Sequence, residues 1–507
     1  MARSGSGRSS GASTPARASS GVGRASVHAA GPADRPISAE LSAALDTLVT
    51  DWGAILALAA FACWVLAHVP ALAPLMTLAW VVVGLAVGIL RPWYGLLLTV
   101  MTVPFTGAAT DVQSGEILRA IPVHAAAVRV LVDRFIIAPS YGRRTPRDPA
   151  WWVVAAAVAA AGLFALAALT AYLAESRDPL VLTGGLVWQV GGPIAMMSAW
   201  IAASHLVAGR SRPLTLVVLG TTVVACLLAL AAWTGLPGAG MFTFTPIVEG
   251  GRLGALGYPT PTAMGLATVL PLAAVAAWRI RWWLVIPVVG LVLVTLVLTW
   301  SRGPLLAVVV GTVLAALASG RVDRRLAIAG AAAGAVALAG LVAIRYGTNV
   351  DAIIATIGAS TGSDSDRIRS WIAAVAIAAS NPLFGAGWAS LARIPEFAAL
   401  RIANAHDLLL DAFAAGGLPL GISLSIVVLY SGWRTWVRRH TMAPYLIAAV
   451  VTFLVCSVWD IPQVRAYAAV MGGMVLGMAA GPLIGRSPDE DTEGDEAGGR
   501  DGDGAGA

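Results

Sequence analysis

Residues 285–319 have the sequence VIPVVGLVLVTLVLTWSRGPLLAVVVGTVLAALAS, in which two apolar runs meet at Ser301 and Arg302. An apolar run of roughly 17–25 residues is long enough to cross a bilayer as an α-helix. The stretch therefore predicts two membrane-spanning helices joined by almost no loop, with an arginine at the junction.

Comparable apolar runs recur along the chain from Trp52 to Ile484. They predict an all-α fold, a polytopic integral membrane helical bundle of about 12–14 transmembrane helices. The predicted spans are 52–69, 72–90, 93–107, 117–138, 150–174, 180–207, 213–236, 259–278, 282–300, 303–319, 325–344, 404–430, 443–460 and 464–484. The lower number omits 93–107, which is short, and 117–138, whose charges place it partly in the membrane interface.

The composition excludes an ordinary soluble protein and argues against nucleic-acid binding. Of 507 residues, 58% are hydrophobic and 12% are charged, whereas soluble domains have about 25% charged residues. The net charge is +6, but the arginines responsible lie in short loops and in one tail. The three cysteines lie inside apolar runs, with neither disulfide nor metal-ligand spacing.

Composition also divides the chain into three regions. Residues 1–45 predict a disordered tail, residues 46–486 a transmembrane domain, and residues 487–507 an acidic disordered tail. Arginines gather in the connections at 91, 143–147, 210–212, 279–281, 321–325 and 434–439. Because cytoplasmic loops carry the excess of positive charge, both tails are predicted to be cytoplasmic.

Two long connections, 237–258 and 345–403, are predicted on the opposite, extracytoplasmic side. The longer one is expected to contain short helices, the clearest from about Asp366 to Ser380, followed by the Pro/Gly-rich turn NPLFGAG. Connections of this length in a compact protein are usually functional.

Cationic side chains stand at predicted helix ends on this side, where the positive-inside pattern predicts few. Arg252 precedes the helix expected from 259, Arg302 stands at the junction quoted above, and His406 lies where the chain returns to the membrane. Arginine offers phosphate oxygens a planar fork of donors, and a helix N-terminus adds backbone donors. An arginine near hydrocarbon costs on the order of 2.5–3.5 kcal/mol at the midplane, which an anionic ligand would offset. His406 is the natural group to accept a proton near neutral pH.

The segment DRIRSW adds two further arginines and a tryptophan. Arg367 and Trp371 are four residues apart and share a helix face, whereas Arg369 points elsewhere. A tryptophan beside these motifs is suited to stacking on a sugar ring.

These motifs, in this order, resemble those of the O-antigen ligase and Wzy-type polymerase superfamily. The stretch TLVLTWSRGPLLAVVVG resembles its T-x-S-R-G helix pair, and RLGALGYPTPTAMG resembles its upstream R-x-x-G…NP element. The run from Asp366 to Leu420 has the R-x-x-x-W, NPLFGAGW and following histidine of its signature. The resemblance covers about 250–425.

The resemblance implies a metal-independent glycosyltransferase without a cofactor, at the outer face of a bacterial cytoplasmic (inner) membrane. The implied donor is a glycan on a polyprenyl pyrophosphate, and the acceptor is a hydroxyl of a glycan, glycolipid or protein. Ligase and polymerase share this donor chemistry, so both stay open. The catalytic residues implied are His406 and Arg302, and the residues implied to bind pyrophosphate or glycan are Arg252, Arg367, Arg369 and Trp371.

The chain departs from the family pattern at two places. Asp407 replaces the usual asparagine after the histidine, where it would either orient His406 or end the loop, and Tyr258-Pro259-Thr260-Pro261 replaces the usual Asn-Pro. Asp460, near an external helix end, could contact substrate or cap the helix, and the cap is the favoured expectation.

Three other functions would make different demands on the sequence. A transporter or lipid-glycan flippase would place ionisable residues near the membrane midplane and show repeat symmetry. A peptidoglycan-type polymerase would need a catalytic acid in an external loop, for which Asp364 or Asp366 is available. A structural subunit would leave the arginines unexplained.

Overall fold

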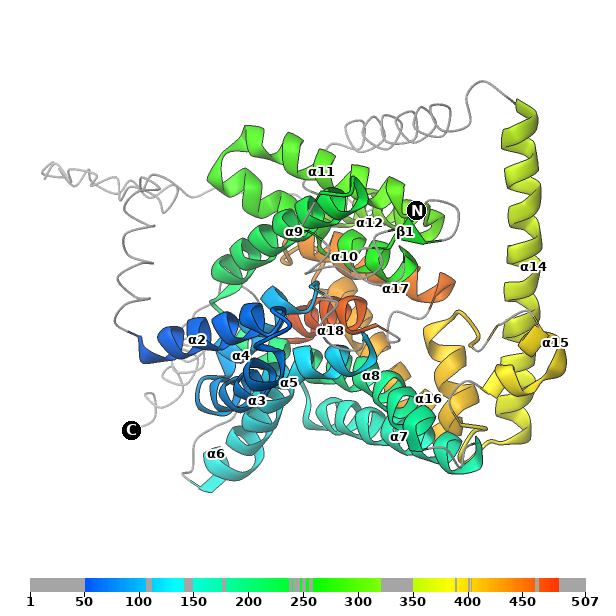
Figure 1. Ribbon diagram of the computed structural model, residues 1–507, viewed down its shortest axis with the longest axis horizontal. Helices are drawn as coiled ribbons and strands as arrows, with labels where there is room; N and C mark the ends of the chain where they lie inside the picture. The colour runs from blue at the N-terminus through cyan, green and yellow to red at the C-terminus, as the bar shows by residue number, and fades with distance from the viewer. Residues whose placement is uncertain are drawn as a thin grey trace, which may run out of the picture. The chain divides into compact units, whose positions relative to one another are not determined.

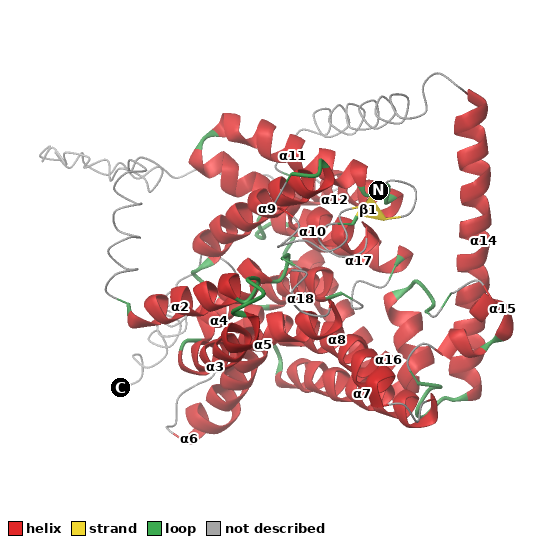
Figure 2. Cartoon of the chain, viewed as in Figure 1, coloured by secondary structure: helices red, strands yellow, loops and turns green. Residues whose placement is uncertain are grey.

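The computed structural model of the protein describes residues 51–105, 112–140, 149–175, 179–236, 239, 247–248, 252–254, 259–320, 350–387, 390–399, 402, 404–460 and 465–482. Within these ranges the chain is almost entirely helical (Figure 2). The predicted all-α class is therefore confirmed. The predicted tails, 1–45 and 487–507, and the predicted span 325–344 lie outside the described residues.

The described helices are coloured in chain order in Figure 1. Their bounds are α2 Trp52–Leu66, α3 Ala73–Leu90, α4 Pro92–Thr102, α5 Val112–Val132, α6 Ala138–Ser140, α7 Trp151–Glu175, α8 Pro179–Leu206, α9 Ser211–Trp233, α10 Pro259–Ile280, α11 Val285–Leu298, α12 Arg302–Ser319, α14 Val350–Ser380, α15 Pro395–Ala399, α16 Leu408–Val437, α17 Pro444–Trp459 and α18 Ala466–Ala480. Two strands, β1 Ile247–Val248 and β2 Arg252–Leu253, pair antiparallel. Among the described helices, α3, α7, α9, α10, α12 and α16 are long and apolar enough to cross a membrane, as a polytopic membrane protein requires.

The helix α18 is buried along its whole length and packs closely on α8. Its glycines at 473, 477 and 481 face successive turns of α8, and a Cβ added to Gly481 would come within 2.6 Å of the Ser204 carbonyl oxygen. Small residues one turn apart let two helix backbones approach closely, which favours helix association in a bilayer.

The helix α5 covers most of the predicted segment 117–138, and among the described helices it is not one of those apolar enough to cross a membrane. It packs against α3, α4 and α8. Arg119 is only 2% exposed, and its guanidinium donates to the Val103 carbonyl oxygen at 2.9 Å. A π-helical turn, Asp133–Ile137, follows, where Arg129 pairs with Asp133 at 2.8 Å. These charges therefore have partners within the protein, and the position of the segment at the membrane interface stays a prediction.

The helix α14 is longer than predicted. The helix expected to begin near Asp366 begins at Val350 and runs to Ser380, and it packs on α16 (Figure 1). Ser and Asp residues at 363–366 resemble a helix start, but inside a helix each costs only a few tenths of a kcal/mol. Ala and Ile residues before them favour an uninterrupted helix.

A kink in α16 receives the turn that follows α14. Gly417 has φ 67° and ψ −163°, which breaks the regular helix. The Ala386 amide donates to the Ala414 carbonyl oxygen at 2.8 Å, and the Leu418 amide donates to the Pro382 carbonyl oxygen at 2.7 Å. The NPLFGAG turn therefore satisfies backbone groups that the kink releases from the helix.

Replacing Gly417 with alanine is expected to destabilise the protein by more than about 1 kcal/mol, because its backbone conformation is essentially restricted to glycine. The added Cβ would also lie 2.6 Å from the Pro382 carbonyl oxygen. Thermal unfolding in detergent measures the effect. The matched control is Gly432→Ala in the regular part of the same helix, where the new Cβ would meet only Leu454 at 3.6 Å. Equal stability of the two variants would contradict the role of the kink.

Candidate functional site

Arg252 is held at the junction between α11 and α12 by the short hairpin. It lies in β2, opposite Val248 of β1. Its Nε donates to the Thr299 carbonyl oxygen at 2.9 Å. Its Nη2 reaches Ser301 Oγ at 3.3 Å and Thr260 Oγ1 at 3.5 Å. These contacts join the hairpin to the first turn of α10 and to the start of α12.

The junction between α11 and α12 is as tight as the sequence predicts. Trp300 turns the chain with φ 57°, Ser301 is the extended N-cap, and α12 begins at Arg302. Ser301 is buried whereas Arg302 is exposed. The Arg302 charge therefore stands at a helix N-terminus, where backbone N–H groups and the helix dipole also favour an anion. This turn lies beside the end of α17, because a Cβ added to Gly303 would be 3.5 Å from Trp459 Cβ.

His406 lies directly before α16 and contacts the end of α17. Its Nδ1 is 3.3 Å from Asp460 Oδ1, and the two side chains are 35% and 15% exposed. Burial disfavours the imidazolium, but the hydrogen bond and the charge of Asp460 outweigh burial. The pKa of His406 is therefore raised above its usual value.

Asp460 acts on Arg252 as well as on His406. Burial lowers the pKa of Arg252, and the charge of Asp460 opposes that shift. The expectation that Asp460 caps a helix is correct for its backbone only, which is the C-cap of α17 and donates to the Cys456 carbonyl oxygen at 3.0 Å. Its carboxylate instead contacts the imidazole. Sequence reasoning missed this contact because the two residues are 54 positions apart.

The helix α14 contributes Arg367 and Trp371 to the same region. Arg367 is partly buried and interacts electrostatically with the imidazole. The Trp371 ring lies beside the Trp459 ring, with centroids 6.2 Å apart. Arg369 points instead to α15, where it is 3.5 Å from Glu396 and both side chains are exposed. The structure therefore brings Arg367 and Trp371 toward the histidine and separates Arg369 from it.

The candidate site is the group Arg252, Arg367, His406 and Asp460, which we call the Asp460 cluster, with Arg302 at the neighbouring helix start. Its basic groups suit an anion. Within the described residues, no three His, Cys, Asp or Glu side chains gather as they would around a metal ion.

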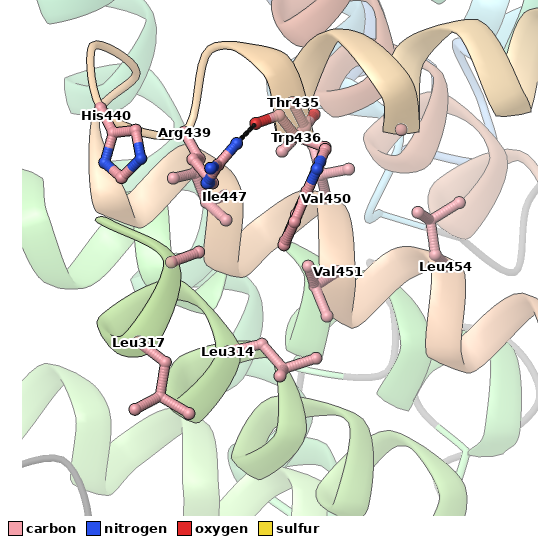
Figure 3. A pocket seen from close by; sticks show the side chains of 12 residues that line it. Leu314, Leu317, Thr435, Trp436, Arg439, His440, Ile447, Val450, Val451 and Leu454 are labelled. Carbon is pink, nitrogen blue, oxygen red and sulfur yellow. Dashed lines mark hydrogen bonds between the residues drawn. The ribbon is translucent and has the colours of Figure 1, made fainter. Parts of the chain in front are cut away.

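A cavity of about 370 Å³ lies elsewhere, between the C-terminal parts of α12 and α16 and the side of α17 (Figure 3). Apolar side chains such as Leu314 and Val450 line it, with Arg439 and His440 at one end (Figure 3). None of the residues expected in the site lines this cavity.

Fold and cluster together define a polytopic helical membrane protein with a cationic site at its helix ends. Residues 287–425 match the family model described as O-Antigen ligase. The match includes Arg302, Arg367 and His406 and excludes Arg252 and Asp460. No curated protein matches the sequence.

Residues 287–425 are therefore similar to an O-antigen ligase domain, and the resemblance to the O-antigen ligase and Wzy-type polymerase superfamily is confirmed. Such a domain implies a membrane enzyme of the glycan ligase or polymerase kind, with lipid-linked glycan substrates.

Asp407, the residue that departs from the family pattern, caps α16. Its Oδ1 accepts hydrogen bonds from the Leu409 and Leu410 amides at 2.9 and 2.8 Å. Aspartate and asparagine are equally good N-caps. The replacement therefore keeps the cap, and in this protein the group that contacts His406 is Asp460.

Asp407→Asn is expected to leave both stability and glycan transfer close to wild type, because an amide oxygen accepts the same two hydrogen bonds. Asp407→Ala should cost about 1 kcal/mol of stability, the usual value of an N-cap. Thermal unfolding and a transfer assay on both variants check this. Loss of transfer in the asparagine variant, with stability intact, would show that the carboxylate itself has a chemical role.

Proposed function

We propose that the protein is a membrane glycosyltransferase that transfers or polymerises a glycan at the outer face of the cytoplasmic membrane, with both termini cytoplasmic. The donor is a glycan on a polyprenyl pyrophosphate, and the acceptor is a hydroxyl of a glycan, glycolipid or protein. The reaction is metal-independent in this proposal. The observation that supports it is the Asp460 cluster, in which one carboxylate interacts with both the guanidinium of Arg252, a group suited to phosphate, and the imidazole of His406.

Arg302 and Arg252 bind the pyrophosphate in this mechanism. The bond from Arg252 Nε to the Thr299 carbonyl oxygen orients the guanidinium plane before any ligand arrives. Donors that are already oriented toward developing charge lower the barrier without a reorganisation cost during the reaction. Arg302 is exposed at the first turn of α12, where helix N–H groups add to its charge.

His406 activates the acceptor. With Nδ1–H donated to Asp460, Nε2 is the nitrogen that accepts the hydroxyl proton. The acceptor oxygen forms a bond to the anomeric carbon, while the bond from that carbon to the pyrophosphate oxygen breaks. The polyprenyl pyrophosphate leaves with the electron pair, and direct displacement inverts the anomeric configuration.

Arg367 and Trp371 bind the donor from α14. Arg367 adds positive charge beside the imidazole, which suits either the pyrophosphate or a sugar hydroxyl. Trp371 lies next to Trp459, and together they offer aromatic surface on which a sugar ring can stack. Arg369 is assigned to the rim of the site because its side chain is exposed and forms an ion pair with Glu396.

Arg302→Ala and His406→Ala are each expected to reduce transfer by at least about 100-fold, the usual range for a lost oxyanion donor or general base. The assay uses purified protein in liposomes with a polyprenyl-pyrophosphate glycan. The matched control is Arg281→Ala, an exposed arginine before α11 that lies outside the Asp460 cluster. Wild-type transfer by both test variants would refute the mechanism.

Asp460→Asn is expected to move the acidic limb of the pH–rate profile to lower pH. Asp460 raises the pKa of His406, so removing its charge lets burial lower that pKa. Because only neutral imidazole accepts a proton, the variant becomes active from a lower pH, with a reduced maximal rate. The control is Asp133→Asn, a carboxylate paired with Arg129 instead. An unmoved acidic limb would show that this limb does not report His406.

A further inference from the structure

Both backbone polar groups of Ala405, the residue before His406, are hydrogen-bonded to side chains. The Ala405 amide donates to Asp411 Oδ1 at 3.1 Å. The Ala405 carbonyl oxygen accepts from Ser370 Oγ at 3.2 Å. Ala405 and Ser370 are 0% exposed and Asp411 is 3% exposed, so water does not compete for these bonds.

The two partners come from different helices. Asp411 lies in the first turn of α16, and its carboxylate reaches back past the N-cap to the chain before the helix. Ser370 lies in α14, and its single hydroxyl proton is shared between the Ala405 carbonyl oxygen and the Arg367 carbonyl oxygen, which is 2.7 Å away. The short segment 404–407 is therefore tied to both helices that border the Asp460 cluster.

The Asp411 carboxyl is buried at an energetic cost. Its Oδ2 forms no hydrogen bond with the rest of the described chain. A buried carboxyl without full hydrogen bonding is unfavourable, and such a group persists where it has a specific role. The hydrogen bond from the Ala405 amide is the interaction that offsets part of this cost.

His406 needs such support because its backbone is strained. Its φ is 53°, in the left-handed region that non-glycine residues seldom occupy. A residue stays in this conformation only when its surroundings over-determine it. With Ala405 fixed, the direction in which the histidine leaves the backbone is fixed as well.

We propose that Asp411 is a positioning residue, which together with Ser370 holds His406 in its left-handed conformation and against Asp460. The kinetic part of this inference rests on the proposed function. The geometric part does not, because it concerns only where the imidazole lies.

The kinetic test compares Asp411→Ala with Asp411→Asn in the liposome transfer assay. Asp411→Ala should lower kcat by about 10- to 100-fold with the donor KM unchanged, since a displacement of about 1 Å can cost that much. Asp411→Asn keeps an oxygen acceptor for the Ala405 amide and should stay within about threefold of wild type.

The geometric test is independent of transfer. Diethylpyrocarbonate reacts with neutral imidazole, so the pH dependence of His406 modification, followed by mass spectrometry, reports its titration. The charged groups acting on His406 are Asp460 from α17, Arg367 from α14 and Asp411 from α16. Asp411→Ala should shift this titration to lower pH, because both carboxylates that favour the imidazolium are lost or displaced. Asp411→Asn removes only the weaker of them and should shift it less.

Wild-type turnover and an unchanged His406 titration in Asp411→Ala would overturn the proposal. If Asp411→Ala does not fold, Ser370→Ala removes the other anchor and should move both readouts in the same direction by a smaller amount. A folded Ser370→Ala protein with neither readout moved would also overturn it. If His406→Ala retains transfer, the proposed function fails, while the modification experiment still decides whether Asp411 positions the imidazole.

Discussion

The arrangement of the candidate site depends on the interactions that the carboxylate of Asp460 makes with two basic side chains. This carboxylate lies at the end of α17 and interacts with His406 before α16 and with Arg252 in the hairpin. Burial disfavours the charged form of both basic groups, and the same negative charge opposes that effect for both. Because the carboxylate is only 15% exposed, water screens its interactions weakly.

The backbone around the site is held in conformations that a free chain would avoid. Trp300 and His406 are the two non-glycine residues with positive φ in the described part of the chain. Trp300 immediately precedes the N-cap of α12, and His406 immediately precedes the N-cap of α16. Such strain survives only on a rigid support. Beside His406 that support comes from the hydrogen bonds of Ala405 to Asp411 and Ser370, and beside Trp300 it comes from the bond of Arg252 to the Thr299 carbonyl oxygen.

Much of the fold was predictable because the length and hydropathy of a local run of residues are enough to indicate a membrane-spanning helix. Apolar runs of sufficient length must form helices, since a bilayer offers no partners for unpaired backbone groups. The one helix start that was wrong has a local cause. The start of α14 was misplaced because Ser and Asp favour helix caps but are also tolerated inside a helix.

The sequence by itself determined the membrane class, the positions of most helices, and which arginines and histidine stand beside helix ends. It determined these because hydropathy and charge act residue by residue. Only the tertiary structure decided which of these groups meet. It brought Asp460 to His406, turned Arg369 toward Glu396, and fixed Ala405 between Ser370 and Asp411. Those contacts join residues from different helices, and the packing that creates them depends on side chains far apart in the chain.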